Sequence, residues 1–450
     1  MDKKKRILIV SPFFASENSI ASIRFTKIGK YLAKDGNTVD VLCGKMHAEM
    51  IEDNTLKCDI KWFEKVIRVK FPGLYYLPLK VPSGNAENSG EKKKFRIIEE
   101  ILAKFYKIIR NDFSSSIWLF VWDRILAALC INAIKREKWQ YFDVVITTYS
   151  PMLSHYVGRY LKKKRMCGIW IADYRDPFLG QREKKMIPGF VFQDNLKVEK
   201  MADFVTTVSK GTKEQIAEEA GKDKDEIRKK IHVVYNGYDI DDRQNIKTTK
   251  RKNEKLQIAY CGMLGIVKNR FVRSPEMLFK ALWELKEEGK VQFNELEFIY
   301  AGPSSDYLKQ CAKKYNVLDI VKDCGYVTRE KSLEIQSQAD IILLCSWNTN
   351  KEQGILTGKF YEAMLLEKKV LALISGEKGN SELKEIIQDC NIGFCCEESM
   401  ESDYENLKKW LAIRFQEKRK NGKIKYDCSE KRFRFRHDVI AMEMEKIWTE

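Results

Sequence analysis

The sequence has no long low-complexity tract, no apolar leader and no uninterrupted apolar run of membrane-spanning length. Met1 is followed by charged residues and then directly by the apolar stretch 7–10, so we expect no secretory signal. The most apolar later stretch, 117–134, is interrupted by Asp123 and Arg124. We expect it to be too short and too charged to span a bilayer and to form a core helix. These absences favour a globular protein of the cytoplasm.

Cysteine is present, but not in a spacing that binds zinc. The twelve cysteines are scattered and lie mostly inside apolar segments, and the adjacent pair Cys395 and Cys396 does not form a CxxC motif. Reduced thiols in a cytoplasmic protein are the best interpretation of this pattern.

Charge is high and unequal in sign, with 81 Lys and Arg against 64 Asp and Glu, a formal net charge of +17. We find no nucleic-acid recognition motif and no basic face interleaved with stacking aromatics, so we expect no nucleic-acid partner. The run 92–94, followed by the basic amphipathic stretch 95–110, is typical of contact with an anionic membrane surface. Solvated lysine-rich faces are the simpler explanation, and peripheral membrane contact stays open beside it.

The length and the order of apolar runs predict two α/β domains. A chain of 450 residues with 44% hydrophobic content exceeds one ordinary domain. A strand at 6–10, a helix at 23–34 and a strand at 38–43 form a βαβ unit, which predicts a doubly wound parallel sheet. A second series opens at 256–261, after a polar stretch without apolar periodicity. The predicted parts are an N-terminal domain at 1–240, a linker at 241–255, a C-terminal domain at 256–430 and a final segment at 431–450.

Short apolar runs that end in turn signals predict the other strands, and longer periodic runs predict helices. The further strands are expected at 65–70, 142–148, 169–172, 202–209, 231–235, 296–301, 321–326, 339–344, 370–373 and 393–395. The further helices are expected at 95–109, 116–135, 275–285, 330–338 and 432–448, with a mobile insertion at 81–90.

One stretch combines the features of an anion-binding loop. Gly354 and Gly358 bracket a short loop, and Thr357 is placed to cap a helix that begins near Gly358. Free backbone N–H groups and the helix dipole attract an anion at such a start, and Lys359 adds a full positive charge. Glu362 lies one turn on, on the same face. This suits a sugar nucleotide, with phosphates at the helix start and ribose hydroxyls on Glu362. An ordinary loop-to-helix turn with exposed charges is the alternative.

Two other loops carry charge at expected sheet edges. Lys268 and Arg273 lie in the first strand–helix loop of the second domain, where cations suit a diphosphate. In the first domain a strand runs directly into Asp173 and Arg175. A local ion-pair network that fixes this loop is the alternative there. His155 reads equally well as a satisfied, half-buried histidine or as a substrate contact.

Several of these stretches together resemble glycosyltransferase family 4. The segment from Gly354 resembles its Gly-x-x-Thr-Gly-Lys-x-x-Glu nucleotide motif, Ser150 to His155 its Ser-Pro-x-x-Ser-His motif, and Trp170 to Pro177 its Trp-Ile-Ala-Asp-x-Arg-Asp-Pro motif. The resemblance runs over nearly the whole chain, weakest from 45 to 140. It implies a GT-B fold, two Rossmann-like domains facing across a cleft, with a terminal helix that crosses back to the first domain.

The resemblance also implies function. It implies a retaining, metal-independent transfer of a sugar from a UDP- or GDP-linked donor to a saccharide or lipid-linked acceptor, with no cofactor, in bacterial surface polysaccharide synthesis. No Asp-x-Asp metal motif is evident in a suitable loop. The implied donor-binding residues are Gly262, Gly325, Tyr326, Thr357, Gly358, Lys359 and Glu362; the implied catalytic residues are Lys359, Arg273, Lys268, Asp173 and Arg175; the implied acceptor or sugar contacts are Arg24, Ser150 and His155.

The chain departs from the family in two places. Better-known members carry a second glutamate eight residues before the first, and this chain has Gly354 there. The usual glycine pair of the first loop is also missing, with Ser19, Ala21 and Ser22 as small residues that could replace it. A GT-B sugar-nucleotide epimerase and a non-catalytic nucleotide-sugar or membrane-surface binding protein therefore remain as alternatives.

Overall fold

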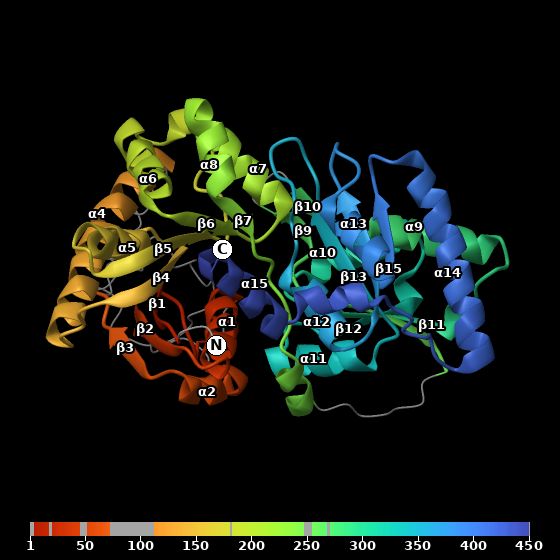
Figure 1. Ribbon diagram of the computed structural model, residues 1–450. Helices are drawn as coiled ribbons and strands as arrows, with labels where there is room; N and C mark the ends of the chain where they lie inside the picture. Colours follow the sequence, from red (N-terminus) through yellow and green to blue (C-terminus); the bar gives the residue numbers. More distant parts are fainter. Residues whose placement is uncertain are drawn as a thin grey trace, which may run out of the picture. The chain divides into compact units, whose positions relative to one another are not determined.

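A computed structural model describes residues 4–17, 20–45, 52–72, 112–180, 182–246, 254–267 and 271–449 (Figure 1). The predicted insertion at 81–90, the predicted helix at 95–109, the basic run 92–94 and the predicted site residue Lys268 lie outside these ranges.

Contacts divide the chain into two compact units. Unit 1 comprises Met1–Thr207, Ile216–Val233 and Ala441–Glu450, and unit 2 comprises Val208–Gln215 and Val234–Ile440. The predicted domains are continuous stretches of the chain with bounds at 240 and 256, whereas each observed unit contains a segment from the other's part of the chain. Residues 208–215 belong with unit 2, and the end of the chain belongs with unit 1.

Unit 1 is built on a parallel sheet whose described strands run in the order β3-β2-β1-β4-β5-β6-β7. Ile7 of β1 lies opposite Val39 of β2 on one side and Val144 of β4 on the other, so the strand order reverses beside β1. The central strands β1, β2 and β4 are buried along almost their whole length, as the continuous apolar runs predict, whereas the edge strand β3 is not. The strand bounds are β1 Arg6–Ser11, β2 Thr38–Gly44, β3 Lys65–Val69, β4 Phe142–Tyr149, β5 Cys167–Tyr174, β6 Phe204–Thr207 and β7 Ile231–Val233.

Helices cover both faces of this sheet, because right-handed crossovers in opposite directions from β1 place them on opposite sides (Figure 1). On one side α1 packs against α2 and the short 3₁₀ turn Ile60–Trp62, and on the other α4, α5 and α6 pack together. The helix bounds are α1 Ile20–Lys34, α2 Asn54–Asp59, α4 Asp112–Arg136, α5 Leu153–Lys163, α6 Gly189–Met201, α7 Lys210–Glu219 and α8 Lys224–Lys230, of which α7 begins in unit 2.

Helix α4 corrects one expectation. Its segment Ser114–Arg136 is long and apolar enough to cross a membrane by length and composition alone, so the prediction of a stretch too short and too charged is wrong. A core helix of a soluble protein meets the same test, but only 28% of the most apolar window of α4 is buried. The expected core role therefore holds for one face of the helix, on which Leu126, Cys130 and Ile134 are buried.

Unit 2 repeats the architecture with a parallel sheet in the order β12-β11-β8-β13-β14-β15 among its described strands. A two-stranded hairpin, β9 Gly265–Val267 with β10 Phe271–Arg273, follows β8 and was not predicted. The sheet strands are β8 Leu256–Cys261, β11 Leu296–Ala301, β12 Val321–Asp323, β13 Ile341–Trp347, β14 Lys369–Ser375 and β15 Gly393–Glu397.

The helices of unit 2 enclose apolar cores on both faces of this sheet. They are α9 Glu276–Glu287, α10 Ser305–Lys314, α11 Arg329–Gln338, α12 Gly358–Leu365, α13 Glu382–Cys390 and α14 Glu401–Asn421, followed by α15 His437–Thr449, whose end belongs with unit 1.

The single terminal helix predicted at 432–448 is interrupted. A 3₁₀ turn covers Glu430–Phe435, and α15 begins only at His437. The extended residue Arg436 lies between them, because its neighbours pair with Tyr238: the Tyr238 N–H donates to the Phe435 carbonyl, and the His437 N–H donates to the Tyr238 carbonyl, both at 2.9 Å.

Candidate functional site

Three glycines line the carboxyl edge of the unit 2 sheet. The Gly262 N–H donates to the Ala301 carbonyl and the Gly302 N–H donates to the Gly325 carbonyl, each at 2.8 Å. A Cβ on Gly302 would lie 2.1 Å from the Gly262 carbonyl oxygen. The backbone after β8 and the backbone after β11 therefore approach so closely that only glycine fits at position 302.

Lys359 lies directly on this glycine edge. A Cβ on Gly262 would be 2.8 Å from the Lys359 Nζ, so glycine there leaves the space that the ammonium group occupies. Burial lowers the pKa of Lys359, the charge of Arg273 lowers it further, and Glu362 opposes both effects. Within the described ranges the ammonium group has neither an ion pair nor a hydrogen bond.

Arg273, at the end of β10, is the second cation of this edge. Its guanidinium carbon lies 5.3 Å from the centre of the Trp347 ring, and its Nε is buried without a hydrogen-bond partner in the described part of the chain. The Trp347 indole N–H donates to a Glu352 carboxylate oxygen at 2.7 Å. The guanidinium of Arg273 thus stacks on an aromatic ring that Glu352 fixes in place. No carboxylate of the described residues pairs with this guanidinium.

Helix α12 begins at this edge as predicted, with Thr357 in the N-cap position and extended backbone (φ −80°, ψ 153°). The Thr357 side chain, however, makes no capping hydrogen bond. The helix start therefore keeps capacity for an external acceptor, next to Gly358 and Lys359.

Glu362 lies one turn into α12 and is partly exposed. Its Oε1 is 3.8 Å from Nε of Arg329, and its Oε2 accepts a hydrogen bond from the Gln336 amide at 3.3 Å. Both partners come from α11, and sequence reasoning missed them because no spacing links α11 to α12. The predicted ribose contact of Glu362 stays a prediction.

The glycine that replaces the expected glutamate has a structural reason. Gly354 has φ +68°, and a Cβ there would lie 2.4 Å from the Ser209 Oγ and 2.8 Å from a Glu382 carboxylate oxygen. Glu382 accepts from the backbone N–H groups of Lys210 and Gly211 at 2.9 and 3.1 Å. It also accepts from the hydroxyl of Tyr235 at 2.8 Å. The chain's own carboxylate therefore fills the place beside Gly354.

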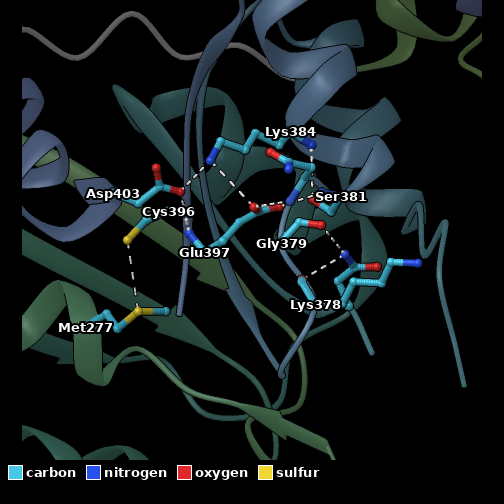
Figure 2. Close-up of polar contacts among 10 residues, drawn as sticks. Met277, Lys378, Gly379, Ser381, Lys384, Cys396, Glu397 and Asp403 are labelled. Atoms are coloured by element: carbon cyan, nitrogen blue, oxygen red, sulfur yellow. Dashed lines mark hydrogen bonds and ion pairs between the residues drawn. The ribbon is translucent and has the colours of Figure 1, made fainter. Parts of the chain in front are cut away.

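At a second helix start in unit 2, backbone N–H groups are already hydrogen-bonded to a carboxylate of the chain. At the start of α13, the Glu397 carboxylate accepts from the N–H groups of Asn380 and Ser381, each at 2.7 Å (Figure 2). Figure 2 shows Lys384 between Glu397 and Asp403, with Nζ to oxygen distances of 3.5 and 2.6 Å. In this network one lysine is paired with two carboxylates, which also accept hydrogen bonds from backbone N–H groups. The cations beside α12 have no such partners in the described residues.

The predicted base-contact residues lie in the loop after β12. Gly325 has φ +64°, and Tyr326 is 81% exposed, an unusual exposure for an aromatic side chain. Their role toward a base stays a prediction.

In unit 1 the structure places Asp173 and Arg24 together in a buried ion pair. The Arg24 guanidinium donates to Asp173 at 2.8 Å, and the two side chains are 2% and 0% exposed. The hydroxyls of Thr148 and Thr206 also donate to Asp173, at 3.0 and 2.8 Å. The sequence left a local ion-pair network within this loop as the alternative, but Asp173 pairs with the distant Arg24 instead. The predicted contacts of both residues with substrates stay predictions.

Arg175 and Ser150 meet in the adjacent loop. The Arg175 guanidinium donates to the carbonyls of Tyr149 and Ser150, each at 3.1 Å. Burial lowers the pKa of Arg175. Arg175 thus holds the loop that follows β4.

His155 lies in the core of unit 1. It is fully buried, its Nδ1 is 2.7 Å from the Thr147 hydroxyl, and the Trp170 indole N–H donates to that hydroxyl at 3.0 Å. Burial lowers the pKa of His155 to about 3, so the ring is neutral near pH 7. The structure shows a buried histidine rather than a half-buried one, and its Nε2 has no hydrogen-bond partner in the described part of the chain. Its predicted substrate contact stays a prediction.

Buried carboxyl groups of unit 1 were not singled out from the sequence. Burial raises the pKa of Glu17 to about 7 and the pKa values of Asp123 and Glu199 to about 8. Of these three, only Asp123 stands out in the sequence, because it is a charged residue inside an apolar stretch. The Glu17 carboxyl lies in the loop after β1 with one oxygen buried and unpartnered.

The whole chain superposes on solved structures of one fold. A UDP-forming α,α-trehalose-phosphate synthase from Burkholderia xenovorans matches with a TM-score of 0.57 at 11% identity, over 99% of each chain. A sucrose-phosphate synthase from Thermosynechococcus elongatus matches with a TM-score of 0.53 at 14% identity, over 99% of this chain and 98% of that one. A putative UDP-N-acetylglucosamine 2-epimerase from Listeria monocytogenes matches with a TM-score of 0.51 at 11% identity, over 99% and 96%.

These likenesses, together with the two parallel-sheet units, define a GT-B fold of two Rossmann-like domains, as predicted. No protein-family model matches the sequence. A search of curated proteins also finds no match. The fold is thus established by structural similarity, and any inference about activity must come from the residues of the site.

Proposed function

We propose that this protein is a glycosyltransferase that uses a nucleotide-sugar donor. The observation that supports this most strongly is the pair of cations Lys359 and Arg273, which lack carboxylate partners among the described residues, at a glycine-lined sheet edge and a helix start. Ligands of doubly wound sheets bind at such edges, and partly buried cations without carboxylate partners favour an anionic ligand. Glu362 is one turn away and would accept hydrogen bonds from ribose hydroxyls.

The reaction follows from the charge that develops. Breaking the bond between the anomeric carbon and the diphosphate oxygen leaves negative charge on the diphosphate. Lys359, Arg273 and the α12 N–H groups are fixed donors that would stabilise this charge without reorganising. We propose that the transfer retains the anomeric configuration and needs neither a metal ion nor a cofactor, as the family resemblance implies.

The finer assignment also rests on the resemblance. We propose a hexosyltransferase of the cytoplasm, peripheral at the inner face of the membrane, that acts on a saccharide or lipid-linked acceptor in surface polysaccharide synthesis. UDP- and GDP-linked donors both suit the diphosphate site. The two glycosyltransferases matched by fold, one of them UDP-forming by name, support this class of reaction.

The test is incubation of the protein with radiolabelled UDP- and GDP-sugars and a membrane extract. We expect label to move into an extractable saccharide or lipid product, and the transfer to survive excess EDTA. Loss of activity in EDTA that magnesium restores would contradict the cation-only account of the leaving group.

A sugar-nucleotide epimerase is the second candidate, and the fold match to a putative UDP-N-acetylglucosamine 2-epimerase favours it. An epimerase would convert the free donor without any acceptor. Chromatography of the nucleotide sugar after incubation with the protein alone distinguishes the two.

A binding protein without transfer activity is the third candidate, favoured by Gly354 and by the Glu382 carboxylate that fills the adjacent space. Donor binding with no product and no epimer would support it.

A further inference from the structure

Helix α4 presents an exposed apolar surface, which we call the apolar ridge. It consists of Ile117, Val121 and Ile125, which follow one another at four-residue spacing, and Phe190 at the start of α6. These side chains are 36%, 48%, 45% and 54% exposed. Phe190 continues the ridge because it packs edge-on against Phe120 of α4, with ring centres 5.1 Å apart.

The opposite face of α4 holds the helix to unit 1. Leu126 and Ile134 are fully buried, and the Asp123 carboxylate accepts a hydrogen bond from the Met152 N–H at 3.1 Å, just before α5. Arg124 pairs with Asp194 of α6 at 3.0 Å. Leaving the unit to cross a bilayer would break these contacts, so they favour a helix that stays packed on unit 1.

Positive charge lies on α4 and in the segment just before α6, and these two helices supply the apolar ridge. From Ser114 to Arg136 the only carboxyl group of α4 is Asp123, which is buried. Lys184 and Lys185 are exposed in the segment before α6. Lys185 pairs with Glu183 at 2.7 Å, and the Lys184 ammonium group lies 4.0 Å from the centre of the Phe192 ring without a carboxylate partner among the described residues. We call Arg124, Lys184 and Lys185 the cationic rim.

The rim keeps a net positive charge after local pairing. Asp194 is shared between Arg124 and Arg159, at 3.0 and 2.8 Å, so one carboxylate faces two guanidinium groups. Burial raises the pKa of Asp123 to about 8, so this carboxyl adds no negative charge near neutral pH.

We propose that the apolar ridge and the cationic rim bind the surface of a bilayer that contains anionic lipids, with α4 in the plane of the membrane. A helix with an apolar stripe and flanking cations inserts at the boundary between headgroups and acyl chains. Charge complementarity selects this occupant, because a second copy of this chain would bring an equally positive rim against this one. The inference does not depend on the proposed transfer activity.

The test is co-sedimentation of the full-length protein with vesicles of phosphatidylcholine alone or mixed with phosphatidylglycerol. We expect binding to the mixed vesicles that weakens with salt. The triple variant Ile117→Ser, Val121→Ser, Ile125→Ser should weaken this binding about tenfold or more, because apolar area no longer leaves water. Lys184→Gln with Lys185→Gln should weaken it about fivefold per lysine and only when anionic lipid is present.

The matched control is Ile413→Ser on α14 of unit 2, where an apolar side chain is 52% exposed. It should leave vesicle binding unchanged, and thermal unfolding should confirm that all variants fold. A second measurement needs no change to the ridge. Trp118 and Trp122 lie beside the ridge on α4, with ring centres 5.7 Å apart, so brominated lipids should quench tryptophan fluorescence. The quenching should be lost in Trp118→Phe with Trp122→Phe.

Three outcomes would overturn the proposal. They are vesicle binding that the triple variant leaves intact, an absence of binding to mixed vesicles, and a dimer that the triple variant dissociates in sedimentation equilibrium. The last result would assign the ridge to a second copy of the chain.

Discussion

The two units share one architecture but use the carboxyl edges of their sheets differently. In unit 1 the buried charges Asp173 and Arg24 at this edge pair with each other, and Arg175 donates to two backbone carbonyls. In unit 2 the edge is lined by glycines, and Lys359 and Arg273 have no carboxylate partner in the described residues. The comparison separates a charge pair that stabilises the fold from two cations that we propose bind the donor diphosphate.

The difference between paired and unpaired charges at the two edges has an energetic meaning. Burying a charge is costly unless it is paired, so a fold that leaves cations unpaired at one edge must gain the counter-charge elsewhere. In unit 2 the neighbouring network around Glu397 shows that this chain pairs buried lysines where they serve the fold. The unpaired cations are therefore the reason that we propose this edge as the nucleotide site.

The largest expected effect concerns the pair in unit 1. Asp173→Ala leaves Arg24 buried without a counter-charge, which should destabilise the protein by about 3–5 kcal/mol. Chemical denaturation should show this loss. The control Glu52→Ala removes a carboxylate from an exposed pair of the same unit and should leave unfolding nearly unchanged. An Asp173→Ala protein of normal stability would mean that this edge is not structural.

Removing either cation of unit 2 should act on catalysis instead. Charge on the diphosphate rises as the sugar leaves, so Lys359→Ala and Arg273→Ala should each lower kcat about a hundredfold or more, with a smaller change in donor Kd. The double variant should lose less than the two effects added together, because both cations act on one group. The control is Lys280→Ala on α9, an exposed lysine away from the edge. Near-normal turnover in both single variants would make this edge ordinary surface.

A smaller effect is expected at Glu362. Glu362→Gln should weaken donor binding about tenfold, since a hydrogen bond to a charged acceptor becomes a neutral one. Thermal stability should hardly change, because Glu362 is partly exposed and its contacts with Arg329 and Gln336 are long. Calorimetric titration with the nucleotide sugar measures this, with Glu330→Gln on α11 as the matched control. Unchanged affinity would remove the ribose contact from the account.

The smallest expected effect is on the pH dependence of stability, through the buried Asp123 of unit 1. The pKa of Asp123 is raised from about 3.8 to about 8 by burial, so the folded protein holds a proton that the unfolded chain releases. The stability from this proton is fully present below about pH 4 and is lost as pH rises through about 8. Asp123→Asn keeps an acceptor for the Met152 N–H and should reduce the fall in Tm between about pH 6 and pH 9. An equal fall in Tm in both proteins would contradict the assignment.

The strands were the most predictable part of the molecule. Runs such as Ile7–Val10 and Ile341–Leu344 are apolar throughout because both faces of a parallel sheet are covered. The start of α12 was equally predictable, since Thr357 and Gly358 are local signals of a helix start. Hairpin β9–β10 was missed because its strands have only three residues each.

What sequence could not supply were contacts between distant segments. Nothing local relates Glu382 to Gly354, or Arg329 to Glu362, although these contacts shape the edge of unit 2. Likewise, α4 is apolar around most of its circumference, so its sequence does not show which face is exposed.

The most direct test of the central claim compares the two edges within one experiment. Hydrogen–deuterium exchange of the protein with and without UDP or GDP should show new protection in peptides that cover Gly262–Gly265, Gly325–Arg329 and Gly354–Glu362 of unit 2. Peptides around Asp173 in unit 1 should exchange at the same rate in both conditions. Protection at the unit 1 edge, or no protection at Gly354–Glu362, would contradict the assignment of the nucleotide site to unit 2.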